Sequence, residues 1–305
     1  MLLAEAHRLH RAPHAGPVRS VQKGKTMAER PGRKAPRVTT ATVVRTERLT
    51  PHMVRVVLGG PEVAALGADR FTDHYVKLLF PRAGVEYPEP FDLERIRAEM
   101  PREQWPDMRT YTVRRWDAER AEMDVDFVVH GEAGLAGPWA AGAAPGDVVR
   151  FSGPGGAYAP DPEADWHLMA GDESALPAIA ASLERLPEGA VAHVFIEVEG
   201  PEEEQPLPNA AGVKPTWLHR GGGRVGEALV RAVRDLERPE GEVQAFVHGE
   251  AGFVKELRRL LRKEWEVPRE RLSISGYWRL GMDEDGWQSS KREWTRQVEE
   301  EQEGA

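Results

Sequence analysis

The chain has 305 residues, a formal net charge of −9 and no cysteine. That length allows two domains with separate hydrophobic cores, and the acidic balance argues against a general nucleic-acid or anionic-membrane surface. The absence of cysteine excludes disulfides, thiol catalysis and cysteine-bound iron–sulfur clusters, so any electron chemistry must use a bound organic cofactor.

Residues 1–36 are rich in Arg, His and Pro, show no hydrophobic periodicity and contain no apolar core of a secretory signal. We expect this leader to be disordered, with its scattered histidines belonging to a flexible segment rather than to a metal site. Met27 is a candidate for the true start, because patterned sequence begins only after Pro36. The longest apolar runs, such as 191–198, are too short to cross a bilayer, and we expect a cytoplasmic protein.

Residues 37–161 are predicted to form an antiparallel barrel. Short alternating segments are separated by turn sequences, as at 59–61 and 145–147. The predicted strands are 38–47, 52–58, 74–80, 109–116, 123–129 and 147–152. Six closely spaced strands are typical of a barrel, and the longer connection at 81–108 contains a predicted short helix at 92–99.

Residues 162–281 show a different rhythm, in which strands and helices alternate. The predicted strands are 166–170, 191–198, 216–219, 243–248 and 271–275, and the predicted helices are 174–186, 224–236 and 250–264. This alternation predicts a doubly wound, largely parallel sheet with helices on both faces. Residues 282–305 are predicted to form a charged C-terminal helix, from 283 to about 300, and a tail. A barrel followed by such a sheet is an oxidoreductase layout, although a layout alone does not prove function.

The segment 109–115, with the sequence RTYTVRR, places basic, hydroxyl and aromatic side chains on one predicted strand. Successive strand residues point to opposite faces, so Arg109, Tyr111 and Val113 share a face that excludes Thr112. Tyr111 and Thr112 reach one ligand edge together only at a strand end or a twist. An exposed strand with basic side chains is the simpler interpretation of these seven residues alone.

Two copies of the sequence VHGEAG, at 129–134 and 247–252, follow predicted strands and precede predicted helices. Glycines permit close backbone approach, and the unpaired N–H groups of the helix that follows the first copy suit a pyrophosphate. The second copy would face the cleft at the carboxyl end of the sheet, where a nicotinamide could lie. We interpret the repeat as one strand-to-helix geometry used twice, and an ordinary turn remains the alternative for the first copy.

A third candidate site is the sequence AGDESALP at 170–177, where Ser174 is a predicted N-cap and Pro177 lies in the first helical turn. The first crossover of a parallel sheet is where a dinucleotide phosphate usually binds. The glycine fingerprint G-x-G-x-x-G is missing, however, and Asp172 and Glu173 would repel a phosphate unless they turn away. Helix capping alone explains this segment nearly as well.

Together, these motifs resemble those of the siderophore-interacting proteins, flavin-containing ferric-siderophore reductases related to the ferredoxin–NADP reductase superfamily. The resemblance extends from about Val38 to Trp294. The matching stretches, in the family's order, are HYVKLLFP (74–81), RTYTVR (109–114), DFVVHG (126–131), AGDESALPAI (170–179) and GYWRLG (276–281). The resemblance implies a six-stranded antiparallel FAD-binding barrel followed by a doubly wound NAD(P)H-binding domain.

The resemblance also implies residue roles around the flavin. Arg109 would contact the FAD phosphates with support from Arg114, Tyr111 would pack on the isoalloxazine, and Thr112 would hydrogen-bond near its N5. The loop at 130–131 would line the ribityl and pyrophosphate region. The predicted cofactor-binding residues are Arg109, Tyr111, Thr112, Val113, Arg114, His130, Gly131, Ala136, Gly137, Asp172, Ser174 and Trp278.

One departure from the family pattern affects the phosphate site. The family often has Gly-Pro-Ala-Ser after the His-Gly pair, and this chain has GLAG at 134–137. Because that serine hydroxyl is missing, the backbone N–H groups of Ala136 and Gly137 would have to bind the phosphate.

The predicted substrate-binding residues are Lys77, Arg279 and Lys291. Lys77 lies where the family places a substrate-facing lysine. Iron chelates are bulky and often anionic, so an acidic protein needs a local cationic patch to hold one. A lysine whose stem packs while its ammonium reaches water is the alternative for Lys77. The aromatic pair at 277–278 suits nucleotide stacking and core packing equally.

In the predicted C-terminal helix, Trp287, Lys291 and Trp294 share one face. Docking on the nucleotide domain explains this stripe, and closure over the nicotinamide cleft is a second interpretation. Glu197 and Glu199 end the strand at 191–198, where acidic groups suit a ribose hydroxyl better than a 2′-phosphate. This pattern predicts a preference for NADH over NADPH.

The sequence therefore predicts a monomeric, cytoplasmic flavoprotein that uses NADH or NADPH to reduce a ferric siderophore, without a resident metal or a nucleic-acid or membrane partner. A ferredoxin is a further candidate donor. A general NAD(P)H:flavin or quinone reductase and a non-catalytic, colourless siderophore-binding protein are the alternatives. The sequence decides neither the siderophore nor the FAD affinity.

Overall fold

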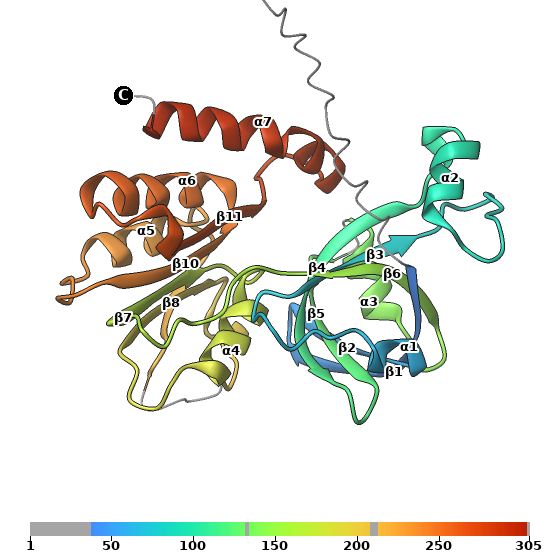
Figure 1. Cartoon of the computed structure of the whole chain (residues 1–305), viewed down its shortest axis with the longest axis horizontal. Coiled ribbons are helices and arrows are strands. Elements are labelled where there is room, and N and C mark those ends of the chain that lie inside the picture. The colour runs from blue at the N-terminus through green and yellow to red at the C-terminus, as the bar shows by residue number, and fades with distance from the viewer. Residues whose placement is uncertain (1–37, 132–133, 208–212, 304–305) are drawn as a thin grey trace, which may run out of the picture. The chain divides into compact units, whose positions relative to one another are not determined.

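Six antiparallel strands form a closed barrel in the first half of the chain, in the order β1-β2-β5-β4-β3-β6 (Figure 1). The computed structural model describes residues 38–131, 134–207 and 213–303, and the predicted leader with Met27 lies outside them. The barrel strands are β1 (Val38–Thr50), β2 (Met53–Gly59), β3 (Tyr75–Phe80), β4 (Asp107–Asp117), β5 (Glu122–Val128) and β6 (Val148–Gly155). All six predicted strands are confirmed, with boundaries that shift by up to three residues.

Alternation of apolar and polar side chains explains why these segments form a barrel. Inward-facing residues such as Leu58, Leu78, Phe127 and Phe151 are completely buried in one core, because each strand points every second side chain inward. Three short helices accompany the strands: α1 (Pro61–Ala64), α2 (Leu93–Glu99) and α3 (Ala136–Gly142). The Asp92 carboxylate accepts two backbone N–H groups at the start of α2, so the predicted helix at 92–99 is confirmed.

A five-stranded sheet follows, in the order β11-β10-β7-β8-β9, and every neighbouring pair in it is parallel. Its strands are β7 (Trp166–Gly171), β8 (Ala192–Val198), β9 (Thr216–His219), β10 (Val243–Glu250) and β11 (Leu272–Trp278). Its helices are α4 (Leu176–Arg185), α5 (Glu227–Arg234) and α6 (Ala251–Arg259), and α6 continues into a π-helical turn at Leu260–Glu264.

The helices of this sheet cover both of its faces, as the doubly wound prediction requires. Leu168 and Val247 pack with α5 and α6, whereas Met169 and Phe246 pack with α4 on the opposite face. Adjacent residues of one strand therefore enter different cores. The described residues belong to one compact unit, in which α4 contacts β4 of the barrel.

Several predicted boundaries in this half of the chain are wrong by more than one residue. The helix α4 begins at Leu176 rather than at 174, and α5 is shorter than predicted at both ends. The strand β11 continues to Trp278, because the predicted aromatic pair extends the sheet instead of starting a loop. These shifts matter because they decide which side chains reach the carboxyl edge of the sheet.

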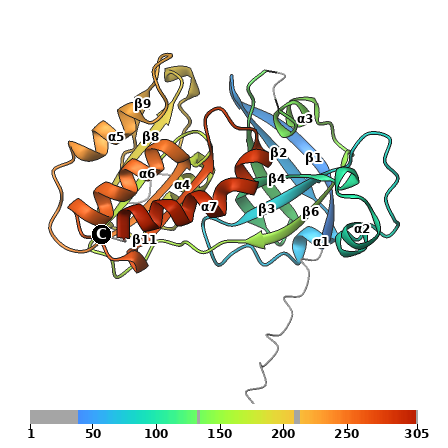
Figure 2. The ribbon, with the colours of Figure 1, turned by 90° about the horizontal axis from the view of Figure 1, so that it is seen from above.

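The last helix, α7 (Glu284–Glu303), packs on the edge strand β11 and runs beside α6 (Figure 2). Trp287 is 1 % exposed and its ring lies against Trp294, as the apolar stripe predicts. A Cβ on Gly276 of β11 would lie 3.0 Å from Trp287, which shows how closely the helix approaches the strand. None of the helices in the described ranges is long and apolar enough to cross a membrane.

Candidate active site

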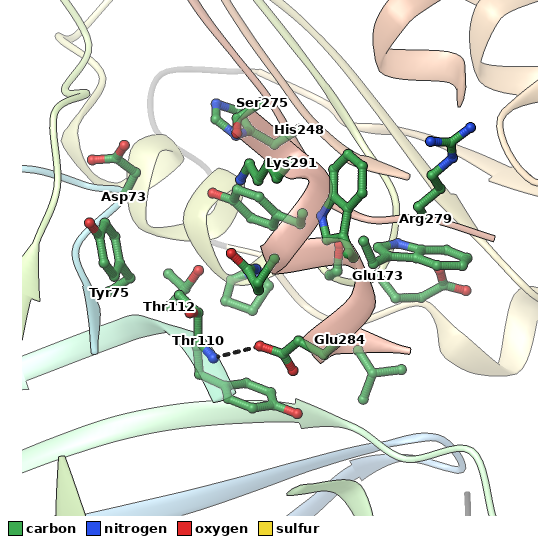
Figure 3. A pocket seen from close by; sticks show the side chains of 18 of the residues that line it. Asp73, Tyr75, Thr110, Thr112, Glu173, His248, Ser275, Arg279, Glu284 and Lys291 are labelled. Carbon is green, nitrogen blue, oxygen red and sulfur yellow. Dashed lines mark hydrogen bonds between the residues drawn. The ribbon is translucent and has the colours of Figure 1, made fainter. Parts of the chain in front are cut away.

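A cavity of about 770 Å³ lies where the barrel meets the carboxyl ends of the parallel strands (Figure 3). Its walls come from three parts of the chain: β3, β4 and β5 of the barrel, the sheet with the loop that follows β7, and the first half of α7. This volume falls within the range of pockets that hold cofactors or drug-sized ligands. The carboxyl edge of a parallel sheet is also where such folds bind ligands.

The barrel wall forms because β4 and β5 separate at one end. Residues 113–117 of β4 pair with β5, whereas residues 107–112 pair with β3 alone. A register shift at Arg114 marks the point of separation. As a result, Thr110, Tyr111 and Thr112 all line the cavity, although neighbouring strand residues normally face opposite sides.

The ring of Tyr111 is fixed at this opening. It packs against Phe127 of the barrel core, with ring centroids 4.3 Å apart. Burial, with a further contribution from the Glu284 carboxylate, raises the pKa of Tyr111, so its hydroxyl stays protonated. Tyr111 thus presents a neutral aromatic surface beside the hydroxyl of Thr112.

On the sheet side, the loop after β7 is held by Asp172. The carboxylate accepts hydrogen bonds from Ser174 N and Oγ, at 2.9 and 2.5 Å, and from Glu250 N and Trp278 Nε1, both at 2.8 Å. The side chain is completely buried, and burial followed by the neighbouring Glu173 raises its pKa to about 6. Asp172 therefore turns inward and does not line the cavity, so this geometry does not support its predicted contact with a cofactor.

The predicted capping role of Ser174 is wrong. The helix α4 begins two residues later, with Ala175 as its N-cap and no side-chain cap. The serine hydroxyl instead donates to the Asp172 carboxylate. That carboxylate also accepts the backbone N–H of Ser174, two residues later in the chain, and so forms a tight turn. Ser174 and Trp278 nevertheless line the cavity, as predicted cofactor-binding residues.

His248, which was not among the predicted site residues, also lines the cavity from near the end of β10. Its ring stacks on Phe246 at 4.0 Å, and its Nε2 is 2.9 Å from Ser273 Oγ. Burial, followed by the positive charge of Lys291, lowers its pKa to about 3, so the imidazole is neutral. Its Nδ1 has no partner among the described residues, and the only sequence signal for it was the second VHGEAG copy.

Two lysines face the same cavity from different elements. Lys77 comes from β3 and Lys291 from α7, and neither has a carboxylate within ion-pair distance among the described side chains. Burial, followed by the charge of Lys77, lowers the pKa of Lys291. Arg279 also lines the cavity and is exposed, as Lys77 is, so all three predicted substrate-binding residues reach one space.

The remaining predicted residues lie outside the cavity lining. Val113 is buried in the barrel core, and Arg114 forms an ion pair with Glu184 of α4 at 2.6 Å. Gly131 has a φ of +57° beside His130, which does line the cavity. Arg109 is held by α7, and Ala136 and Gly137 are buried at the start of α3. Their cofactor contacts stay predictions.

Two family models match the chain over both halves of this site. The model described as "Siderophore-interacting FAD-binding domain" matches residues 42–158, and "Siderophore-interacting protein" matches residues 164–281. A Mycobacterium tuberculosis protein, "Uncharacterized protein Rv2895c", is 47% identical over 265 residues, covering 82% of this chain and 93% of that protein. The chain belongs to the siderophore-interacting protein family.

Other members of the family carry functional names. The chain is 35% identical over 259 residues to "Ferric vibriobactin reductase ViuB" of Vibrio cholerae, covering 81% of this chain and 92% of ViuB. It is 30% identical over 242 residues to "NADPH-dependent ferric-chelate reductase" of Escherichia coli, covering 78% of this chain and 91% of that protein.

Solved structures of the family share the two-part fold. The siderophore-interacting protein SipS from Aeromonas hydrophila superposes with a TM-score of 0.72 and 32% identity, covering 86% of this chain and 99% of that chain. A siderophore utilization protein from T. fusca gives 0.70 and 39%, covering 81% and 94%. The predicted fold class is therefore confirmed.

The family implies FAD, and most of the cavity suits it. A flavin ring needs a flat neutral surface with hydrogen-bonding groups at its edge, and Tyr111 and Thr112 supply both. The loop after β5 is open as well, because a Cβ on Gly131 or Gly134 would meet no atom within 4 Å. Carboxylates already occupy two of the predicted contacts, Arg109 and Arg114.

Proposed function

We propose that this protein is an FAD-dependent reductase of ferric siderophores that takes its electrons from a reduced nicotinamide nucleotide. The observation that carries the proposal is the shared cavity. The flavin-side groups Tyr111 and Thr112, the carboxyl edge of the parallel sheet, and the two unpaired lysines all line one space. The names of the Vibrio and Escherichia relatives support the same reaction class.

The chemistry that FAD would supply when bound is the conversion of one nicotinamide hydride into two single electrons, enough to reduce two ferric ions with release of one proton. The chain's own residues bind and align the reactants. Tyr111 and Thr112 would hold the flavin edge, and Ser174 and His248 lie where the sheet would receive the nicotinamide. Ferrous iron then leaves its hard oxygen ligands more easily, because it carries less charge.

Lys77 and Lys291 would hold the iron chelate through charge. Catecholate and hydroxamate chelates carry oxygen ligands and are often anionic, and these two ammonium groups have no carboxylate partner among the described residues. The partial burial of Lys291 makes its charge costly without an anion beside it, so a bound anion would relieve that cost. Neither lysine needs to exchange a proton with the substrate.

For the electron donor, the acidic surroundings of a second cavity favour NADH. This cavity of about 220 Å³ shares His130 and Glu173 with the larger one, and it also contacts Glu199, Glu203 and Arg220. Three carboxylates surround the Arg220 guanidinium, so its charge is already neutralised. A 2′-phosphate here would meet excess negative charge, whereas ribose hydroxyls can donate to carboxylates.

One of the two glutamates that predicted a preference for NADH lies away from the second cavity. Glu197 is completely buried, and its carboxylate accepts Gly226 N at 2.7 Å and Leu229 N at 3.3 Å at the start of α5. Its role is therefore structural, and only Glu199 of the predicted acidic pair reaches the second cavity.

An anaerobic titration of the purified, flavin-loaded protein with NADH and with NADPH tests the donor. We expect a yellow protein whose flavin absorbance is bleached more efficiently by NADH. A colourless protein would favour a non-catalytic siderophore-binding function, and equal or better efficiency with NADPH would contradict the donor proposal. Higher steady-state rates with free flavin or a quinone than with a ferric siderophore would instead identify a general reductase.

The lysine assignment is tested with Lys77→Gln and the matched exposed control Lys214→Gln, which lies outside the cavity lining. We expect Lys77→Gln to lower kcat/KM for an anionic ferric siderophore by about tenfold, as the loss of one favourable charge contact would. The rate of flavin reduction by NADH should stay unchanged in both variants. Equal losses in both half-reactions would indicate a folding defect and contradict the assignment.

A further inference from the structure

The first turn of α7 fills an anion-binding site on the barrel. The Nη1 and Nη2 atoms of Arg109 each lie 3.2 Å from a carboxylate oxygen of Asp285, and its Nε lies 3.4 Å from Glu284. Glu284 also accepts the backbone N–H of Thr110 at 3.1 Å, drawn as a dashed line in Figure 3. Two carboxylates from one helix therefore satisfy two adjacent residues of β4.

The separation of β4 from β5 explains why this site exists. Thr110 belongs to the part of β4 that pairs with β3 alone, so the N–H on its other side has no strand partner. The Glu284 carboxylate takes the place of the missing strand carbonyl. Arg109 adds a fixed positive charge beside this N–H, because its side chain is only 14% exposed.

The arrangement suits a phosphate as well as it suits a carboxylate. A guanidinium binds either group through two parallel N–H donors, and Asp285 now occupies that edge of Arg109. A third Arg109 hydrogen bond, from Nη1 to Met108 O at 2.8 Å, fixes the direction of the guanidinium. A phosphate could reach the same donors only by displacing Asp285, and it would then repel the neighbouring Glu284.

The rest of α7 is anchored independently of this contact. Trp287 is buried against β11, and farther along the helix Glu301 pairs with Lys255 at 2.6 Å and Glu299 pairs with Arg269 at 2.9 Å. Displacement of the acidic first turn would therefore leave the remainder of the helix docked.

We propose that the acidic first turn of α7 competes with the phosphate groups of FAD for Arg109 and the Thr110 N–H, so that FAD binding displaces this turn from the barrel. The inference rests on the proposed function and on the predicted contact of Arg109 with the FAD phosphates. We call Glu284 and Asp285 the latch. In this proposal the latch contacts the barrel when FAD is not bound and leaves it when FAD binds. By linkage, weakening the latch must tighten FAD binding.

The test compares FAD affinity of the apo full-length protein, measured by quenching of flavin fluorescence, in three variants. Glu284→Gln with Asp285→Asn removes both negative charges and keeps the side-chain shapes. Glu293→Gln with Glu300→Gln removes the same charge from exposed positions of α7 that pair only with Arg296 and Gln297. Arg109→Ala tests the proposed function itself. Hydrogen exchange of the segment 282–287, with and without FAD, reports the displacement directly.

We expect the latch variant to bind FAD at least about fivefold more tightly, within the usual range of coupling between sites, and the control variant to match the wild type. Exchange at 282–287 should accelerate in the wild type when FAD is added. Unchanged or weaker FAD binding by the latch variant, or equal tightening in the control, would overturn the competition while leaving the proposed function intact. Full FAD occupancy in Arg109→Ala would instead overturn the phosphate role of Arg109 and the latch with it.

Discussion

The two VHGEAG copies have the same six residues and reach the same cavity, but their surroundings differ. His130 is exposed where β5 ends, and α3 begins six residues after it. His248 lies inside β10, between β7 and β11, and is 4% exposed. The helix α6 begins three residues after it, so the expectation of one shared strand-to-helix geometry is wrong.

The second copy is also held by contacts that arise elsewhere in the chain. Its Glu250 caps α6 by accepting Gly252 N at 2.5 Å, and its own N–H donates to Asp172 of the loop after β7. The last residues of β5, 126–128, pair with β2 alone, whereas β10 pairs with both β7 and β11 as far as His248. The comparison teaches that a short motif takes its role from the contacts that surround it in the fold.

The largest expected effect is a difference in stability between the alanine variants of the two glycines that follow these histidines. In Gly249→Ala, the new Cβ would lie 2.6 Å from both Asp172 Oδ2 and Phe253 Cζ, at a φ of +137°. We expect a loss of about 3–5 kcal/mol of unfolding free energy, as for a clash in a packed core.

Gly131→Ala is the matched change, because Gly131 has a φ of +57° and no atom within 4 Å of the new Cβ. It should cost only about 1–2 kcal/mol, the strain of a left-handed alanine. Urea denaturation of both variants measures the difference. Equal losses would show that the two glycines have equivalent surroundings.

A smaller difference is expected between the histidines themselves. His248→Ala removes a ring that stacks on Phe246 and lies 4.9 Å from Tyr277, and the resulting void should cost about 2–3 kcal/mol of unfolding free energy. His130→Ala removes an exposed ring, and its cost should stay within about 0.5 kcal/mol. Thermal or urea unfolding checks both, and a stability loss in His130→Ala as large as that in His248→Ala would contradict this account.

The smallest effect concerns pH. The native pKa of His248 is about 3 and the unfolded value is about 6.5, so below pH 6.5 the unfolded chain binds a proton that the native chain refuses. The resulting loss of stability grows as pH falls from about 6.5 toward 3. Asp172 acts with the opposite sign, because its native pKa of about 6 lets the folded protein bind a proton first between about pH 6 and 4.

His248→Asn should remove the first contribution and leave the second. Between pH 6 and pH 5, we expect the variant to lose about 1 kcal/mol less unfolding free energy than the wild type does. Urea midpoints measured across this interval, with unchanged m-values, give the comparison. Parallel pH profiles for the two proteins would show that His248 is not held in its neutral form.

The regular elements were predictable because local pattern specifies them. Alternating apolar residues predicted all six barrel strands, and the stripe of Trp287 and Trp294 predicted the packing face of α7. The five parallel strands followed from the alternation of strand and helix. Predicted boundaries near functional loops were wrong more often. At Ser174 the hydroxyl donates to the Asp172 carboxylate of the same turn and does not cap α4.

The sequence by itself determined the barrel, the parallel sheet, the amphipathic last helix and the family, because each depends on periodicity or on ordered motifs within short stretches. Only the tertiary structure decided that β4 pairs with β5 from Val113 onward and not at Thr112. It also decided that the Asp172 side chain turns inward, and that Arg109 forms ion pairs with Glu284 and Asp285. These contacts join residues up to 176 positions apart. Pairing and burial across such separations depend on how whole elements pack, and no local pattern encodes them.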